Sequence, residues 1–138
     1  MKPSVIFFGS FQHYSVTVLE ALRQAQGINL LAVVTTPPKV SKTRGKTISL
    51  KTPVQNYAEK FKLPLFIPAS LDPISLSQLP HSDFFVVAGY GKILPQSWLD
   101  FPTITPLNLH FSLLPAYRGA NPAEWAILRG EPETGVTL

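Results

Sequence analysis

Residues 108–119 read N-L-H-F-S-L-L-P-A-Y-R-G, and this is the most informative stretch of the chain. Its first three residues form an Asn-x-His at the end of an apolar run that begins at Ile104. Successive side chains of a strand point to opposite faces. Asn108 and His110 are therefore predicted to lie on one face of the strand, and Leu109 on the other. An amide donor and an imidazole that titrates near neutral pH would then meet in one space. This strand end is therefore a candidate site for transferring an acyl-type group.

Outward from this strand, apolar runs of strand length alternate with segments of helical spacing. Strands are expected at residues 4–8, 29–35, 65–67, 83–88 and 103–110, with a further strand beginning at 136–138. Helices are expected around residues 16–22, 52–61, 72–79, 95–99 and 120–130. The alternation predicts an α/β fold with a Rossmann-like, mostly parallel twisted sheet and flanking helices. Ligands of such sheets bind beyond the carboxyl ends of the strands, where Gly9, the segment 89–91 and His110 fall.

Local signals mark several helix ends. Thr52, Asp72 and Asn121 each precede a proline, a pattern that predicts an N-cap followed by proline at the first helical position. Gly27 follows the first helix, where a left-handed C-cap is expected.

Composition narrows the class of protein. The chain has 138 residues, of which 45% are hydrophobic and 14% charged, as expected for one globular domain. It has no cysteine, which removes disulfides and thiolate catalysis. The N-terminus does not resemble a signal peptide, and no apolar run approaches the ~20 residues of a membrane span, so a cytoplasmic location is expected. His13 and His110 have no third ligand at plausible spacing, so no metal site is expected.

The net charge of +4 is concentrated in one segment. Residues 39–51 contain no acidic side chain, and their five cations are Lys39, Lys42, Arg44, Lys46 and Lys51. Such a segment is either a solvated basic loop or a contact for an anionic partner.

The order of several motifs resembles the formyltransferases that use 10-formyltetrahydrofolate, and most closely those that act on methionyl-tRNA. The resemblance rests on F-F-G at the start, V-V-T-T-P, R-G-K, V-V-A-G-Y-G-K-I-L-P, the Asn-x-His stretch and P-A-E-W-A-I-L-R-G-E-P-E-T-G-V-T. It spans nearly the whole chain. It implies an N-terminal catalytic domain that transfers a formyl group to the amino group of methionyl-initiator tRNA in translation initiation.

The resemblance also implies roles for individual residues. Asn108 would donate to the oxyanion that forms on the formyl group, and His110 would manage protons. The residues expected to contact the folate are Val87, Gly89, Tyr90, Gly91, Ile93, Leu94, Ser112, Leu113, Leu114 and Pro115. From the residues alone, a His near a strand end is more often an ordinary polar residue than a catalyst, Asn108 could cap local backbone groups, and the glycines could simply permit a tight turn.

The basic segment is the expected RNA contact. In the tRNA enzymes of this family a long basic loop follows the second strand, and the matching cations are Lys39, Lys42, Arg44 and Lys46. Arg44 is singled out because guanidinium can bind phosphate bidentately. The segment lacks the acidic residue and the second proline of the family pattern, and the turn at residues 10–14 also departs from it.

The family pattern continues beyond residue 138, with an Asp in an L-D-x-G loop and a C-terminal domain. Residues 1–138 are therefore expected to be a partial catalytic domain, weak or inactive alone, from an enzyme that is monomeric when complete. Two alternatives stay open: an enzyme of the same fold that formylates a small amine or hydrolyses formyltetrahydrofolate, and an inactive folate- or RNA-binding remnant.

Overall fold

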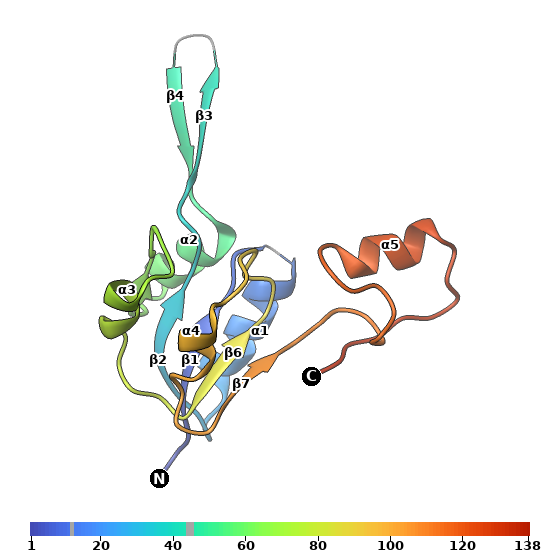
Figure 1. Ribbon diagram of the computed structural model, residues 1–138. Coiled ribbons are helices and arrows are strands. Elements are labelled where there is room, and N and C mark those ends of the chain that lie inside the picture. The colour runs from blue at the N-terminus through green and yellow to red at the C-terminus, as the bar shows by residue number, and fades with distance from the viewer. Residues whose placement is uncertain (12, 44–45) are drawn as a thin grey trace.

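The computed structural model describes residues 1–11, 13–43 and 46–138. A five-stranded sheet with parallel neighbours forms its centre, in the order β5-β2-β1-β6-β7 (Figure 1). Its strands are β1 (Ser4–Phe8), β2 (Asn29–Val34), β5 (Leu65–Phe66), β6 (Phe84–Val87) and β7 (Thr105–Asn108). The predicted Rossmann-like parallel sheet is confirmed, and its carboxyl ends share one edge.

Five helices connect or follow these strands in the described part of the chain. They are α1 (His13–Gln24), α2 (Pro53–Lys60), α3 (Pro73–Ser77), α4 (Gln96–Leu99) and α5 (Pro122–Leu128). None of them has the length and apolar character that crossing a membrane requires.

The predicted helix ends are partly correct. Thr52 caps α2 and Asp72 caps α3, because their side chains accept hydrogen bonds from the backbone N–H groups three residues on, at 3.0 and 2.7 Å. Asn121 occupies the N-cap position of α5 with Pro122 following it, as predicted, but the expected side-chain cap is wrong, since this residue is left-handed (φ 55°, ψ 46°) and its side chain makes no cap hydrogen bond. The left-handed cap at Gly27 is also wrong, because Gly27 does not have a positive φ.

The central strand β1 is covered on both faces, as its unbroken apolar run predicts. Ile6 and Phe8 pack on one side in a cluster with Trp98 of α4 and Leu76 of α3. Val5 and Phe7 pack on the other side with residues of α1 and α2. The sheet is thus the middle layer of three, with helices packed against both of its faces.

The basic segment expected as a loop is a β-hairpin. Strands β3 (Lys39–Thr43) and β4 (Lys46–Leu50) pair antiparallel and project away from the sheet (Figure 1). Because directly opposite residues share a face, the register places Lys39 and Lys46 on one face of the ribbon and Lys42 on the other.

The chain after β7 extends away from the sheet and carries α5 (Figure 1). It returns near its end, where the backbones of His110 and Thr137 exchange two hydrogen bonds of 2.8 Å. The strand predicted at 136–138 is present only as this isolated antiparallel bridge.

Candidate active site

The site is built on the adjacent carboxyl ends of β6 and β7. Val87 pairs in register with Asn108, and the N–H of Leu109 donates to the Val87 carbonyl at 2.8 Å. The two strands therefore end at the same level, and a cavity of about 670 Å³ opens beyond them. Asn108 and His110 both border this cavity.

His110 is held at both its backbone and its ring. Its backbone is bridged to Thr137, and its Nε2 lies 2.8 Å from the carbonyl oxygen of Tyr117. A carbonyl only accepts hydrogen bonds, so Nε2 is the donor in this contact. In the neutral ring this leaves Nδ1 as the nitrogen that can accept a proton, which is the requirement for a general base.

Asn108 is exposed, whereas His110 is half-buried. None of the side-chain hydrogen bonds within residues 1–11, 13–43 and 46–138 uses the Asn108 carboxamide. Its N–H₂ group is therefore available to a ligand in the cavity, as an oxyanion donor must be.

The opposite wall is formed by the segment after β6. Gly89 and Gly91 have φ values of +63° and +80°, so this segment turns sharply as it leaves the sheet. A Cβ added at Gly89 would lie 2.9 Å from Cδ2 of Phe11 and 3.0 Å from Oγ of Ser15. Glycine here thus permits both the turn and the close approach of the β1–α1 connection.

Ser15 locks that connection to the segment after β6. Its hydroxyl donates to the carbonyl of Ala88 at 2.6 Å and accepts from the N–H groups of Ser10 and Phe11 at 3.1 and 3.0 Å. Ser15 is fully buried, so these bonds are shielded from water. Ser10 and Phe11 are thereby held beside the segment after β6.

Tyr90 contributes a buried aromatic ring to the wall of the cavity. It is 1% exposed, and its ring meets Phe8 edge-on at 5.5 Å. Burial raises the pKa of the Tyr90 phenol to about 12.

The structure brings together half of the residues predicted to contact folate. Those that border the same cavity as Asn108 and His110 are Val87, Gly89, Tyr90, Gly91 and Ile93.

The other five lie elsewhere. Leu94 packs against the core cluster that contains Trp98. Ser112 is buried and donates to the carbonyl of Ala116 at 2.7 Å, while Leu113, Leu114 and Pro115 are exposed. A Cβ on Gly135 would come within 2.6 Å of the Leu113 side chain, so Leu113 lies against the end of the chain.

Several residues that border the cavity were not predicted from the sequence. Tyr14 stacks on Phe111 with 4.2 Å between ring centroids, and its hydroxyl donates to Glu124 at 3.4 Å. Partial burial, followed by the nearby Glu124 carboxylate, raises the pKa of Tyr14. His13 also borders the cavity, although its sequence context gave it no role.

The parallel order of the strands could have predicted that the residues after β1 border this cavity. Phe11, His13 and Tyr14 follow β1, whose carboxyl end lies on the same edge of the sheet as those of β6 and β7. Residues after β1 are therefore placed beside residues after β6, whatever their separation in sequence.

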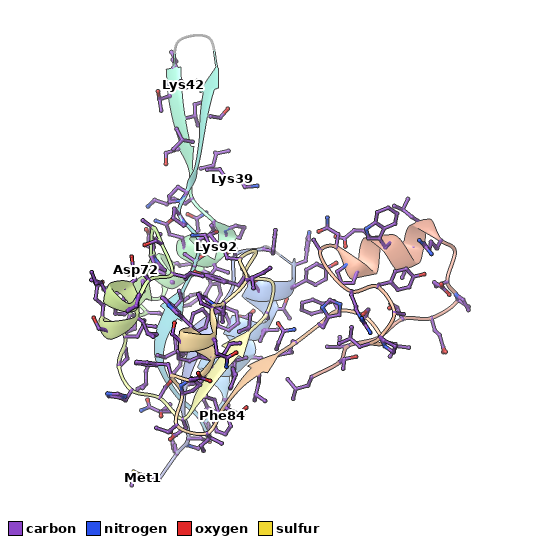
Figure 2. All side chains as sticks on the ribbon, in the orientation of Figure 1. Met1, Lys39, Lys42, Asp72, Phe84 and Lys92 are labelled. Atoms are coloured by element: carbon purple, nitrogen blue, oxygen red, sulfur yellow. The ribbon has the colours of Figure 1, made fainter. Side chains whose placement is uncertain are left out.

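Three of the four predicted RNA-contacting cations, Lys39, Lys42 and Lys46, lie on the strands of the hairpin. Figure 2 shows Lys39 at its base and Lys42 farther along it, and both are exposed, as is Lys46. Arg44 lies outside the described residues.

A family model described as "Formyl transferase" matches residues 1–138. Methionyl-tRNA formyltransferase of Prochlorococcus marinus (strain MIT 9515) is 44% identical over 138 residues, and that of Protochlamydia amoebophila (strain UWE25) is 42% identical over 141. These alignments cover 97% and 99% of this chain but 41% and 43% of the relatives, so the chain spans about two fifths of their length.

Solved structures share the fold. A phosphoribosylglycinamide formyltransferase from Anaplasma phagocytophilum superposes with a TM-score of 0.72 at 24% identity, covering 99% of this chain and 63% of that one. A formyltetrahydrofolate deformylase from Pseudomonas syringae pv. tomato str. DC3000 gives 0.69 at 23% identity, covering 99% and 45%.

Proposed function

Because this chain belongs to the formyl transferase family, we propose that it carries the folate-binding catalytic half of a methionyl-tRNA formyltransferase. The reaction moves a formyl group from 10-formyltetrahydrofolate to the amino group of methionyl-initiator tRNA, in the cytoplasm and at the start of translation. The proposal takes the complete enzyme as a monomer that needs no metal. The observation that carries it is the convergence of Asn108, His110 and the Gly89–Gly91 turn on one cavity.

The chemistry requires two groups, and the cavity offers both. The acceptor nitrogen attacks the formyl carbon, a new C–N bond forms, and the bond from that carbon to the folate nitrogen breaks. Negative charge develops on the formyl oxygen, where the Asn108 carboxamide would donate a hydrogen bond. The attacking amine must lose a proton, which Nδ1 of His110 would accept and the departing folate nitrogen would finally receive.

The formyl donor enters the proposal as a substrate, and the cavity suits its shape. A volume of about 670 Å³ lies within the roughly 300–1,000 Å³ of small-molecule sites. Val87, Tyr90 and Ile93 give apolar walls, and the backbone of Gly89 and Gly91 can read the polar edge of a flat pterin.

The proposal also includes the folate contacts that lie outside this cavity, at Leu94 and residues 112–115. The 112–115 loop begins two residues after His110, and its Leu113 and Leu114 side chains are half exposed. The loop would have to close toward the cavity to add a second apolar wall.

The acceptor would approach from the hairpin side. Lys39, Lys42 and Lys46 project from the two faces of an exposed ribbon, and Arg44 completes the proposed set. Cations so arranged contact phosphates without reading sequence, and such contacts weaken as salt rises.

Titration calorimetry with a stable analogue of 10-formyltetrahydrofolate tests the donor site. Asn108→Ala should weaken binding several-fold, because its hydrogen bond to the formyl oxygen is lost. His110→Ala should also weaken binding, because its ring borders the cavity. Asn56→Ala and His81→Ala are matched controls, since both side chains are exposed and neither borders the cavity. Unchanged affinity in folded Asn108 and His110 variants would contradict the proposed function.

A further inference from the structure

A cavity of about 450 Å³ lies against α5 and the segment that precedes it. Among the described residues, its lining has no member in common with the lining of the cavity of Asn108 and His110. Figure 1 shows α5 set apart from the sheet and from the hairpin. The cavity is therefore a separate surface of the molecule, and the proposed formyl transfer gives it no role. Its lining residues are Ala116, Tyr117, Arg118, Trp125, Arg129 and Glu131.

Trp125 gives this cavity an exposed aromatic surface. It is 51% exposed, whereas Trp98, the other tryptophan of the chain, is fully buried. The backbone N–H of Arg129 donates to the carbonyl of Trp125 at 3.0 Å, so these two residues lie one helical turn apart on the same face of α5. The Arg129 guanidinium also lies over the ring of Tyr117, 5.7 Å from its centroid. A planar ligand can thus stack on the indole with a cation beside it.

Both arginines of the cavity can receive an anion. Arg118 and Arg129 are exposed, and within residues 1–11, 13–43 and 46–138 neither makes an ion pair. Glu131 is the one carboxylate among the described lining residues, and it accepts a hydrogen bond from the hydroxyl of Tyr117. Two guanidiniums and one carboxylate leave the cavity with a net positive charge. Each guanidinium can bind a phosphate through two parallel hydrogen bonds.

These groups together favour an unpaired nucleotide as the ligand. An indole stacks on the face of a base, and every base has such a face, whereas guanidiniums pair with the phosphate. A ligand that is only apolar would leave both arginines without partners, and a polyanion without bases would not use Trp125. In a duplex the faces of the bases are covered by their neighbours, so the ligand has to be single-stranded.

We propose that this cavity binds an unpaired nucleotide of an RNA, with its base stacked on Trp125 and its phosphate held by Arg118 and Arg129. The inference rests on the proposed function, which gives the chain an RNA partner. It adds a contact that is separate from the hairpin and from the aminoacylated end, because that end has to reach the cavity of His110.

Tyr117 connects the two cavities. It borders the cavity of Trp125, and its carbonyl oxygen lies 2.8 Å from Nε2 of His110. RNA bound at Trp125 therefore lies beside the turn that positions His110.

The first test uses the fluorescence of Trp125, because a base stacked on an indole quenches its emission while the buried Trp98 stays shielded. Single-stranded hexaadenylate is titrated into the folded 138-residue chain, and its affinity is compared with that of a hexanucleotide backbone without bases. The hexaadenylate should quench the emission and bind about fivefold more tightly or better, as expected when base stacking contributes.

Variants assign the effect to individual side chains, with labelled RNA followed by fluorescence anisotropy. Trp125→Ala should reduce the affinity for hexaadenylate to about that of the backbone without bases, and Arg129→Met should weaken the binding of both strands. Leu128→Ala is the matched control for the first, because it removes an exposed apolar side chain of α5 that does not line the cavity. Lys2→Met is the control for the second, because it removes an exposed cation at the start of the chain. Both controls should bind hexaadenylate as the wild type does.

Four results would overturn the inference. Equal affinities for the two strands, or unchanged emission, would show that no base stacks on Trp125 and that the cavity is only a contact for polyanions. Adenosine monophosphate that binds as tightly as hexaadenylate would assign the cavity to a free nucleotide. Duplex RNA that binds as tightly as the single strand would exclude recognition of unpaired bases. Equal losses in Trp125→Ala and Leu128→Ala would exclude a particular role for the indole.

Titration with the donor analogue separates this inference from the proposed function. Donor binding should depend on Asn108 and His110 and be unchanged in Trp125→Ala, because Trp125 does not line their cavity. A donor analogue that quenches Trp125 and binds more weakly to Trp125→Ala would assign the cavity to the donor and overturn the inference alone. Base-dependent RNA binding by a chain that binds no donor would support the inference and contradict the proposed function.

Discussion

At the scale of single residues, Gly89 connects the stability of the domain to the shape of its cavity. Its φ of +63° is rarely adopted by residues with side chains, and a Cβ there would meet Phe11 and Ser15 at 2.9 and 3.0 Å. Gly89→Ala should therefore lower the free energy of unfolding by about 1–3 kcal/mol, measured by urea denaturation. It should also weaken binding of the donor analogue, because Phe11 must move.

Gly27 is the matched control for this substitution. Nothing lies within 4 Å of a Cβ built on Gly27, and its φ is not positive. Gly27→Ala should be neutral or stabilise by up to about 1 kcal/mol, since alanine restricts the unfolded chain. Equal destabilisation by the two substitutions would show that the contacts of Gly89 have no particular importance.

The sequence predicted those residues of the site that lie close together along one strand segment, and it missed those brought in from other elements. Asn108 and His110 border a common cavity, as the alternation along a strand predicted, although β7 ends at Asn108 and His110 lies two residues beyond it. That alternation could not reveal that Tyr14 lies against Phe111, because that contact depends on how α1 meets the distant end of β7. The hydrogen-bond partner of His110 Nε2 could not be predicted from the sequence either, because an irregular turn brings the Tyr117 carbonyl to it.

At the scale of elements, Asp83 joins the start of β6 to the start of β1. Its carboxylate accepts from the backbone N–H and the hydroxyl of Ser4 at 2.7 and 2.8 Å. These bonds, followed by one from Thr103, lower the pKa of Asp83 below 3.8. A lowered folded-state pKa means that its contribution to stability is present above the unfolded-state pKa and is lost as pH falls through the folded value.

Asp83→Asn should therefore make stability less dependent on pH below about pH 4. The measurement is the urea midpoint of each protein between pH 5 and pH 2. Asp100→Asn leaves the link to Ser4 intact and should keep the wild-type dependence. If the Asp83 and wild-type curves ran parallel over this range, the link would contribute nothing to acid sensitivity.

The β3–β4 hairpin was not predicted from the sequence, and the exposure of its side chains explains why. Val40, Ile48 and Leu50 are 65%, 47% and 59% exposed, so its strands have no buried face to impose an apolar period on the sequence. A polar segment without alternating apolar residues is predicted from its sequence to be a loop. The pairing of β3 with β4 depends on backbone hydrogen bonds, which leave little trace in the choice of side chains.

At the scale of the whole molecule, the order of elements was predictable because each buried strand is a short apolar run. The strand order β5-β2-β1-β6-β7 is harder to derive, since the right-handed crossover rule restricts topologies without choosing among those that remain. The layers themselves follow from β1, whose apolar side chains on both faces require helices on both sides.

The two tryptophans provide a test of where the stability of the whole domain resides. Trp98 is fully buried and packs edge-on against Phe8 at 6.1 Å, whereas Trp125 on α5 is 51% exposed. Trp98→Ala should lower the free energy of unfolding by about 3–5 kcal/mol, through the lost packing and the cavity left behind. Domains of this size have only about 5–15 kcal/mol in total, so the variant should approach unfolding. Trp125→Ala should cost less than about 1 kcal/mol. Urea unfolding followed by circular dichroism compares them, and similar costs would mean that the α5 segment is as firmly packed as the sheet.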